Sequence, residues 1–203
     1  HKGRGDMKNI IEFGAIADGA ALNTEAFKAA IDASVLDGGG IVYVPAGEYL
    51  TGPIQLKSNI TLFIESGAKL LFSNNIEDYP VIETYWEGNP CKAYSPQIFA
   101  MEAENITIAG RGVLEGQGEV WWNLLRTGKL KFARPRMIGL QDCKNVMIEG
   151  VTLQNSPSWT VNPVYCKNVT IDKISINNPS NSPNTDGINP DASKNVHIAN
   201  CNL

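Results

Sequence analysis

The 203-residue sequence lacks the features that define several protein classes. No apolar run approaches the roughly 18 residues of a membrane span, so we expect no membrane partner. Its 17 Lys and Arg do not outnumber its 21 Asp and Glu, which argues against general nucleic-acid binding. Its 4 cysteines form no C-x-x-C pair, which excludes the usual zinc and thioredoxin-like sites. With 43% apolar residues, the chain is typical of a globular protein with a large core.

The first residues give little information about the compartment. Residues 1–6 lack the apolar stretch of a signal peptide, and we interpret them as a terminal segment outside the folded domain. Arg4-Gly5-Asp6 spells an integrin-type tripeptide, which at a chain terminus is more simply an accident of sequence. Localisation is unknown from the sequence, with a secreted or periplasmic protein favoured over a cytoplasmic one.

Only one helix is clearly indicated. It runs from Glu25 to Ala33 with Asn23 or Thr24 as its N-cap, carries apolar residues at helical spacing, and ends near the glycines at 38–40. Beyond it, short apolar runs alternate with Gly, Asn, Ser and Pro, which is typical of strands joined by turns.

An internal repeat decides the fold class. One phrase occurs three times, and the residues that follow it repeat an alternating apolar pattern: Lys144-Asn-Val-Met-Ile148, Lys167-Asn-Val-Thr-Ile171 and Lys194-Asn-Val-His-Ile198. Weaker copies cover 58–62 and 104–108, and the 46 residues between Asn59 and Asn105 correspond to two units of about 23. Such a period favours an all-β, right-handed parallel β-helix rather than a leucine-rich repeat or a β-sandwich.

We therefore predict a single β-helix domain over 7–203. An N-terminal cap takes about 7–40, where the helix covers the open edge of the first coil, and some seven coils take about 41–203.

The repeat gives simple explanations for two other patterns. Asn59, Asn105 and Asn168 begin glycosylation sequons, but their repeat position favours asparagines stacked at a turn. Cys143 and Cys166 precede the phrase in adjacent coils, where side chains run parallel, so we expect free thiols rather than a disulfide.

The longest of the three final coils contains the strongest candidate for a functional residue. Aligning Ile188 with Val161 places four extra residues between Asn178 and Thr185, just before Asp186, and puts Trp159 in register with Asp186. Because insertions on one face of a solenoid build its site, Asp186 with an aromatic sugar platform at Trp159 is the functional interpretation. A turn residue that caps its own backbone is the equal alternative for Asp186, and a bend at Gly187 is needed to keep Ile188 inside.

Several segments resemble the polygalacturonase family of glycoside hydrolases, the pectin-cleaving right-handed β-helices. The segments are Asn155–Thr160, Pro163–Ile171 and above all Asn184–Pro190, with Phe13–Gly19, Gly116–Trp122 and Arg134–Arg136 in support. The resemblance covers nearly the whole chain. It implies inverting hydrolysis of α-1,4-linked galacturonic acid in polygalacturonate or pectin, with a polysaccharide or oligogalacturonide substrate and no metal or other cofactor. Calcium-dependent pectate lyases share the fold, but the sequence gathers no acidic cluster of their kind.

The resemblance assigns roles to particular residues. Asp186 would be the catalytic base that helps to activate water, and Asn184 would help to hold the saccharide. Trp86 lies in a segment similar to a loop that closes the site of chain-end (exo) enzymes, although Tyr85 stands where an arginine is expected.

A cationic run and two neighbouring tryptophans are weaker candidates. The run could attract polygalacturonate, and we list Arg136 as substrate-binding, although a solvated surface is the commoner origin of such a run: Lys129, Lys131, Arg134 and Arg136. Trp121 and Trp122 could stack on sugars, or equally could pack beneath a loop.

Other parts of the family's site have no counterpart in the sequence. The general acid and the third aspartate of the family form an Asp-Asp pair one coil after the base, which corresponds here to positions 208–213, and no such pair occurs in this chain. His197 occupies a strand position of the repeat and is interpreted as an outward side chain. We therefore expect the N-terminal part of a longer enzyme, inactive by itself. A non-catalytic glycan-binding or adhesive β-helix is the alternative, and the oligomeric state is unknown.

Overall fold

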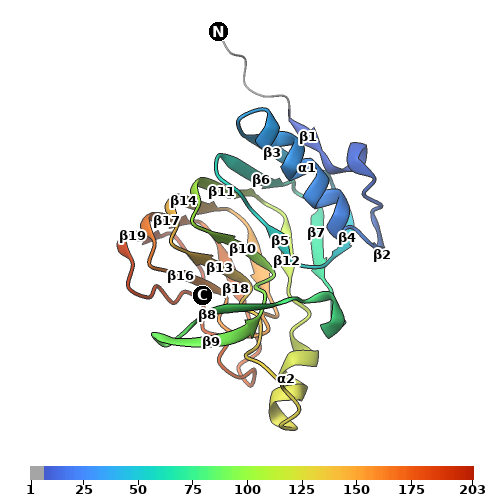
Figure 1. Cartoon of the computed structure of the whole chain (residues 1–203). Helices are drawn as coiled ribbons and strands as arrows, with labels where there is room; N and C mark the ends of the chain where they lie inside the picture. Colours follow the sequence, from blue (N-terminus) through green and yellow to red (C-terminus); the bar gives the residue numbers. More distant parts are fainter. Residues whose placement is uncertain (1–6) are drawn as a thin grey trace.

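The computed structural model describes residues 7–203, so the expected terminal segment 1–6 with its Arg-Gly-Asp tripeptide lies outside the described residues. The chain winds into a parallel β-helix whose coils stack from β1 to β19 (Figure 1). Every pair of neighbouring strands in its three main sheets is parallel, as the repeat predicts. No helix within residues 7–203 is long and apolar enough to cross a membrane.

The strands of each sheet follow one another along the helix axis. Sheet A contains β1 (Lys8–Asn9), β3 (Gly40–Val44), β6 (Ile60–Ile64), β11 (Glu104–Gly110), β14 (Lys144–Glu149), β17 (Lys167–Asp172) and β19 (Lys194–Ala199). Sheet B contains β2 (Asp18–Leu22), β4 (Gly47–Thr51), β7 (Ala68–Phe72), β12 (Val113–Glu115), β15 (Thr152–Gln154) and β18 (Ser175–Asn177). Sheet C contains β5 (Ile54–Gln55), β10 (Ile98–Met101), β13 (Ile138–Gln141) and β16 (Val161–Val164).

The apolar columns of the repeat form the core. Val146 pairs with Val169 and Val169 with Val196, so equivalent residues of successive coils stack. Val146 and Val169 are buried and their polar neighbours are exposed, because alternate side chains of a strand point to opposite faces. The sequence alignment of these coils is confirmed.

The asparagines of the repeat form a continuous ladder along one turn of the solenoid. Each side-chain Nδ2 donates to Oδ1 of the preceding asparagine at 2.9–3.2 Å, through Asn59, Asn105, Asn145, Asn168 and Asn195. All five adopt positive φ between 55° and 65°, a conformation that asparagine tolerates well. The predicted stacking is confirmed.

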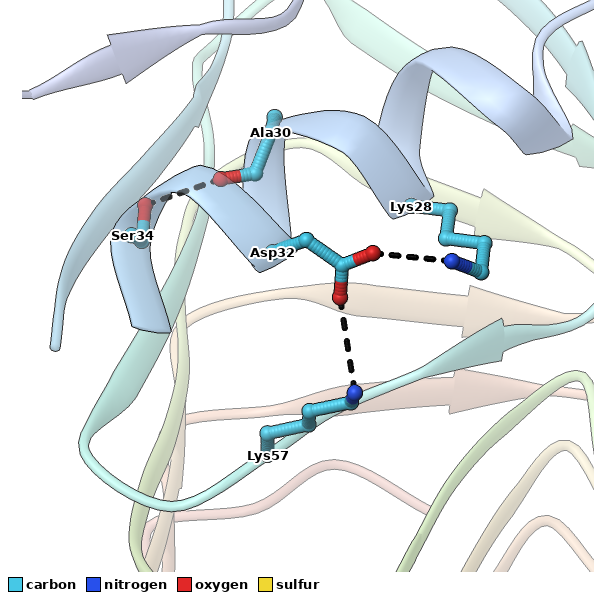
Figure 2. Close-up of polar contacts among 5 residues, drawn as sticks. All are labelled: Lys28, Ala30, Asp32, Ser34 and Lys57. Carbon is cyan, nitrogen blue, oxygen red and sulfur yellow. Dashed lines mark hydrogen bonds and ion pairs between the residues drawn. The ribbon is translucent and has the colours of Figure 1, made fainter. Parts of the chain in front are cut away.

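The helix α1 (Thr24–Leu36) covers the first coils, as expected, and buries Phe27 and Ile31. The expected side-chain cap is absent, because the Asn23 amide instead bonds the backbone of Ile16, Ala21 and Leu50. Asp32 joins α1 to the segment after β5, accepting from Lys28 Nζ at 2.8 Å and pairing with Lys57 Nζ at 3.4 Å (Figure 2).

The predicted division of 59–105 into two units is wrong. Strand β6 pairs directly with β11, so Asn59 and Asn105 belong to neighbouring coils and the 46 residues form one long coil. The extra length is an antiparallel hairpin, β8 (Val81–Trp86) and β9 (Asn89–Tyr94), whose turn residues Glu87 and Gly88 both have positive φ.

The following coil carries a second insertion, which contains a helix that the repeat pattern did not indicate. This helix, α2 (Glu119–Arg126), projects from the solenoid below sheet C in Figure 1. The remaining short helices are 3₁₀ turns, η1 (Ile10–Phe13) and η2 (Ile76–Asp78).

The cysteines behave as expected for a ladder. Cys143 and Cys166 are buried free thiols in adjacent coils, and each Sγ points to backbone carbonyls. The hydrogen bond with the neighbouring Cys143 thiol, followed by burial, raises the pKa of Cys166, which keeps it protonated.

Candidate functional site

Three side chains of different chemistry occupy equivalent positions in successive coils. Val161 pairs with Ile138 on one side and with Ile188 on the other, and this register aligns Arg136, Trp159 and Asp186. Backbone hydrogen bonds continue the alignment, since Met137 N donates to Trp159 O and Thr160 N donates to Asp186 O. Neighbouring strands lie about 4.8 Å apart, so the three positions form a column at that spacing. The predicted match of Trp159 with Asp186 is confirmed.

The hairpin supplies a second indole to this column. Trp86 stacks on Trp159 with ring centroids 4.4 Å apart and an interplanar angle of 13°. The Arg136 guanidinium carbon lies 4.9 Å from the Trp86 ring centroid and 5.7 Å from that of Trp159. One cation therefore contacts two stacked rings, an arrangement stabilised by the quadrupoles of the indoles. One face of the predicted sugar platform is occupied by Trp86.

Arg136 is buried without a direct ion pair among the described residues. Its side chain donates to Tyr85 O, but its Nε has no hydrogen-bond partner within the described residues. The ion pairs within residues 7–203 are all made by lysines, so no carboxylate of this part of the chain lies within ion-pair distance of the guanidinium, although Asp191 acts on it from farther away. Burial lowers the pKa of Arg136 to about 10, and the group still carries its charge at neutral pH. An unpaired buried charge is costly, so this site favours an anion.

The prediction that the cationic run is solvated is correct for its lysines and wrong for its arginines. Lys129 and Lys131 are exposed, whereas Arg134 and Arg136 are 4% and 2% exposed. Arg134 donates to Pro157 O at 2.9 Å, to Pro183 O at 2.6 Å and to Asn184 Oδ1 at 2.8 Å. In the run Lys-x-Lys-x-x-Arg-x-Arg the two exposed members are lysines and the two buried members are arginines. The signals available in the sequence were this difference in residue type, the family resemblance of Arg134–Arg136, and the register of the arginines with Pro157 and Trp159.

The segment that precedes Asp186 is braced by a residue that sequence reasoning did not select. Asn178 Oδ1 accepts from Ser156 N at 2.9 Å, and its Nδ2 donates to Thr160 Oγ1 and Thr185 O at 2.9 Å. Asn178 is the last residue before the four-residue insertion, and this position is the feature of the sequence that could have identified it. The insertion is therefore a fixed part of the site rather than a free loop.

Asp186 itself faces solvent. The backbone bends at Gly187, so that Asp186 is exposed while Ile188 packs against the core, as the side-chain parity required. Asn189 Nδ2 approaches Asp186 Oδ2 at 3.4 Å. Asp186 and Asn184 line a hollow of about 330 Å³, which has room for a monosaccharide unit. The alternative interpretation of Asp186 as a self-capping turn residue finds no support, because no backbone N–H within the described residues donates to its carboxylate.

The hairpin covers the outer face of sheet C beside the column. Ile82 and Thr84 face Phe99, Gly139 and Gln141, and the space between hairpin and sheet is only about 20 Å³. This volume accommodates a water molecule but not a sugar ring. The column is therefore open toward Asp186 and closed on the side of β10.

Of the remaining candidates, the two neighbouring tryptophans are buried and His197 is exposed. Trp121 is fully buried against Tyr79 and Tyr94, and Trp122 is buried with its Nε1 donating to Ser156 O. His197 is exposed on β19 in register with Thr170, as expected. Within residues 7–203, no group of three or more His, Cys, Asp and Glu is arranged to hold a metal ion.

Comparison with known proteins gives consistent matches. The family model described as "Glycosyl hydrolases family 28" matches residues 40–203. A probable polygalacturonase of Vitis vinifera is 42% identical over 207 residues, which cover 98% of this chain and 42% of the relative. An endo-polygalacturonase of Pectobacterium carotovorum subsp. carotovorum is 35% identical over 173 residues, covering 76% of this chain and 42% of the relative.

A solved structure shows the same fold. The hyperthermoactive exopolygalacturonase from Thermotoga maritima superimposes with a TM-score of 0.88 and 35% identity, covering 97% of this chain and 52% of that one. The chain therefore spans about half the length, or less, of these proteins.

Proposed function

This chain belongs to family 28 of the glycosyl hydrolases, and from that membership we propose that it forms part of an enzyme that hydrolyses α-1,4-galacturonosyl bonds of polygalacturonate or pectin. The observation that carries the proposal is the register of Arg136, Trp159 and Asp186. A cation, an aromatic ring and a carboxylate at coil spacing supply the contacts that an anionic sugar and its attacking water need.

Asp186 is the proposed base of an inverting mechanism. In inverting glycosidases a carboxylate activates water on one face of the sugar while an acid, about 6.5–9.5 Å away, protonates the leaving oxygen. The exposed Asp186 at the edge of the 330 Å³ hollow is accessible to such a water. Asn184 lines the same hollow and is the proposed contact to the saccharide.

Arg136 is the proposed site for a uronate carboxylate. Its buried guanidinium has no carboxylate of the described residues within ion-pair distance, and its Nε is an unused donor. A galacturonate carboxylate would supply a direct anionic partner through a charge-assisted hydrogen bond. Because Arg136 also lines the 20 Å³ space that admits no sugar ring, the hairpin must move for the carboxylate to reach it. Trp86 and Trp159 are the proposed apolar walls of the sugar site. Because Trp86 covers one face of the Trp159 ring, the sugar would contact the uncovered edge of that ring.

Chain-end action is the proposed mode of attack. The hairpin closes the groove over sheet C on the side of β10, and the 20 Å³ beneath it excludes a continuing polymer. An internal position on a galacturonan would require a groove that is open at both ends. A blocked groove favours substrates that enter with one terminus.

The general acid is proposed to lie outside these 203 residues. The sequence contains no Asp-Asp pair, and the relatives it matches are about twice as long or longer. We therefore expect the 203-residue polypeptide alone to hydrolyse polygalacturonate hardly at all, and the intact gene product to do so.

Product analysis tests this proposal. The intact gene product is incubated with polygalacturonate, and the products are resolved by chromatography and by NMR of the anomeric protons. We expect monomeric galacturonate from the earliest time, released as the β-anomer because inversion converts the α-linkage. A ladder of oligomers would contradict chain-end action, and unsaturated products would contradict hydrolysis. Binding without products would favour the alternative, a glycan-binding β-helix.

A further inference from the structure

Arg134 is a second buried cation near the site, and its environment differs from that of Arg136. It is 4% exposed, and no carboxylate of residues 7–203 lies within ion-pair distance of it. Its three hydrogen bonds go to Pro157 O, Pro183 O and Asn184 Oδ1. All its partners in this part of the chain are therefore neutral oxygens, and two of them belong to the segment that leads to Asp186.

These contacts join elements that are distant in sequence. Arg134 lies 23 residues from Pro157 and 50 residues from Asn184, so one guanidinium crosslinks three consecutive coils. Asn184 also adopts a left-handed backbone with φ of 51°, a conformation that asparagine tolerates well. A rigid fork of donors suits this task, because several bonds are fixed by ordering one planar group.

The chemistry of the guanidinium determines how the Asn184 amide is oriented. Arginine offers only donors, so it can bond Oδ1 of Asn184 but not its Nδ2. With Oδ1 held inward, Nδ2 is the amide atom left for other partners. Asn184 is exposed and lines the hollow beside Asp186.

We propose that Arg134 is a positioning residue that fixes Asn184 so that its Nδ2 donates to an acceptor oxygen of the saccharide bound beside Asp186. The saccharide part of this assignment rests on the proposed function, whereas the fixing of the segment does not. A hydroxyl or carboxylate oxygen of galacturonate accepts such a bond. Arg134 therefore makes Asn184 a hydrogen-bond donor toward the saccharide without touching the substrate itself.

The variant Asn184→Asp tests separately whether Arg134 fixes residue 184 and whether residue 184 donates to the saccharide. A carboxylate at 184 would pair with the buried Arg134 and retain its position, but it would offer only acceptors to the saccharide. We expect a higher Tm, by about 2–4 °C for a chain of this size, together with weaker use of substrate. A gain in stability with a loss of function is not expected of a purely structural residue.

The chain offers a matched control for the loss of a cation. Arg126 donates to Asn181 O at 2.6 Å, so it holds the same segment but does not contact Asn184. Arg126→Met removes the same charge and one bond to the segment. Arg134→Met removes the bonds to Pro157, Pro183 and Asn184, whereas Arg134→Lys retains the charge but has a single donor nitrogen in place of the guanidinium fork.

The experiment combines three kinds of measurement. Hydrogen exchange of residues 182–187, Tm, and kcat and KM for an oligogalacturonide are all measured on the intact gene product. For Arg134→Met we expect at least 10-fold faster exchange and a KM raised at least 5-fold, with Arg134→Lys intermediate and Arg126→Met within twofold of wild type in KM.

Two results would overturn the proposal. The first is an Arg134→Met variant with unchanged exchange and unchanged KM. The second is an Asn184→Asp variant whose Tm and KM both match the wild type. If the wild type has no hydrolase activity, the proposed function fails, but exchange and Tm still decide whether Arg134 fixes Asn184.

Discussion

The indole of Trp86, at the end of the hairpin strand β8, stacks on the indole of Trp159 at 4.4 Å between ring centroids. These residues are separated by 73 positions in sequence, and the stack fastens the hairpin to the solenoid beside Asp186. The contact determines which part of the groove is open, and so connects the fold to the proposed mode of attack.

Removing this stack should release the hairpin. Trp86→Ala loses an aromatic pair, worth about 0.5–1.5 kcal/mol beyond the burial of its area. We expect hydrogen exchange within Val81–Tyr94 to rise about 10-fold while exchange in β3 stays unchanged. Trp86→Phe, which retains a ring, should give a smaller rise, and equal exchange in all three proteins would show that the stack does not hold the hairpin.

The asparagine ladder should contribute measurably to stability. Asn145 donates to Asn105 and accepts from Asn168, and its φ is 55°. Asn145→Ala loses two hydrogen bonds and strains a left-handed backbone, so we expect urea unfolding to show a loss of about 2–3 kcal/mol. Asn145→Gly keeps the backbone conformation and should lose about 1 kcal/mol. Equal losses would contradict the backbone part of this argument.

The contact between α1 and the first coils should weaken in acid. The hydrogen bond from Lys28, followed by that from Lys57, lowers the pKa of Asp32 below its ordinary value of 3.8. A carboxyl with a lowered folded-state pKa stabilises the fold above its unfolded pKa, and this contribution disappears as pH falls through the folded value.

The pair is largely exposed, so its contribution is small, about 0.5 kcal/mol. Asp32→Asn should therefore lower stability by this amount at pH 7, and the difference from wild type should vanish as the pH falls well below 3.8. Unfolding curves of both proteins from pH 7 to pH 2 measure this. A difference that persists at the lowest pH would mean that the charge is not the cause.

Arg136 should determine the preference for a carboxylate over its ester. Loss of a charge-assisted hydrogen bond costs about 1.5–3 kcal/mol, so Arg136→Gln should lower kcat/KM for polygalacturonate by about 10–150-fold. The decrease should be much smaller for a methyl-esterified substrate, which has no carboxylate to lose. Arg111→Gln removes an exposed cation outside the column and should change neither value. A uniform decrease on both substrates would indicate that Arg136 only supports the fold.

The sequence was sufficient to predict the parts of the fold that repeat. Stacking of Asn145 on Asn168 and of Val146 on Val169 could be predicted because each coil repeats the same local pattern. The hairpin and α2 could not be placed, because an insertion interrupts the period and its length alone does not show where it folds. The 46 residues from Asn59 to Asn105 look like two coils for this reason.

The candidate site was predictable where it follows the register. Trp159 and Asp186 could be aligned from Val161 and Ile188, whereas the stack of Trp86 on Trp159 depends on how the hairpin folds back in three dimensions. The burial of Arg134 likewise depends on carbonyl groups of distant coils, which no local pattern indicates.

The most direct test of the central claim is the rate of galacturonate release from polygalacturonate by the intact gene product with and without Asp186→Asn. Asp142, on the exposed turn between β13 and β14, provides the control variant Asp142→Asn. Since a general base contributes about 10²–10⁴-fold, we expect Asp186→Asn to lower kcat by at least 100-fold at unchanged folding, with Asp142→Asn at the wild-type rate. Near-normal release by a folded Asp186→Asn protein would contradict the assignment of Asp186 as the catalytic base.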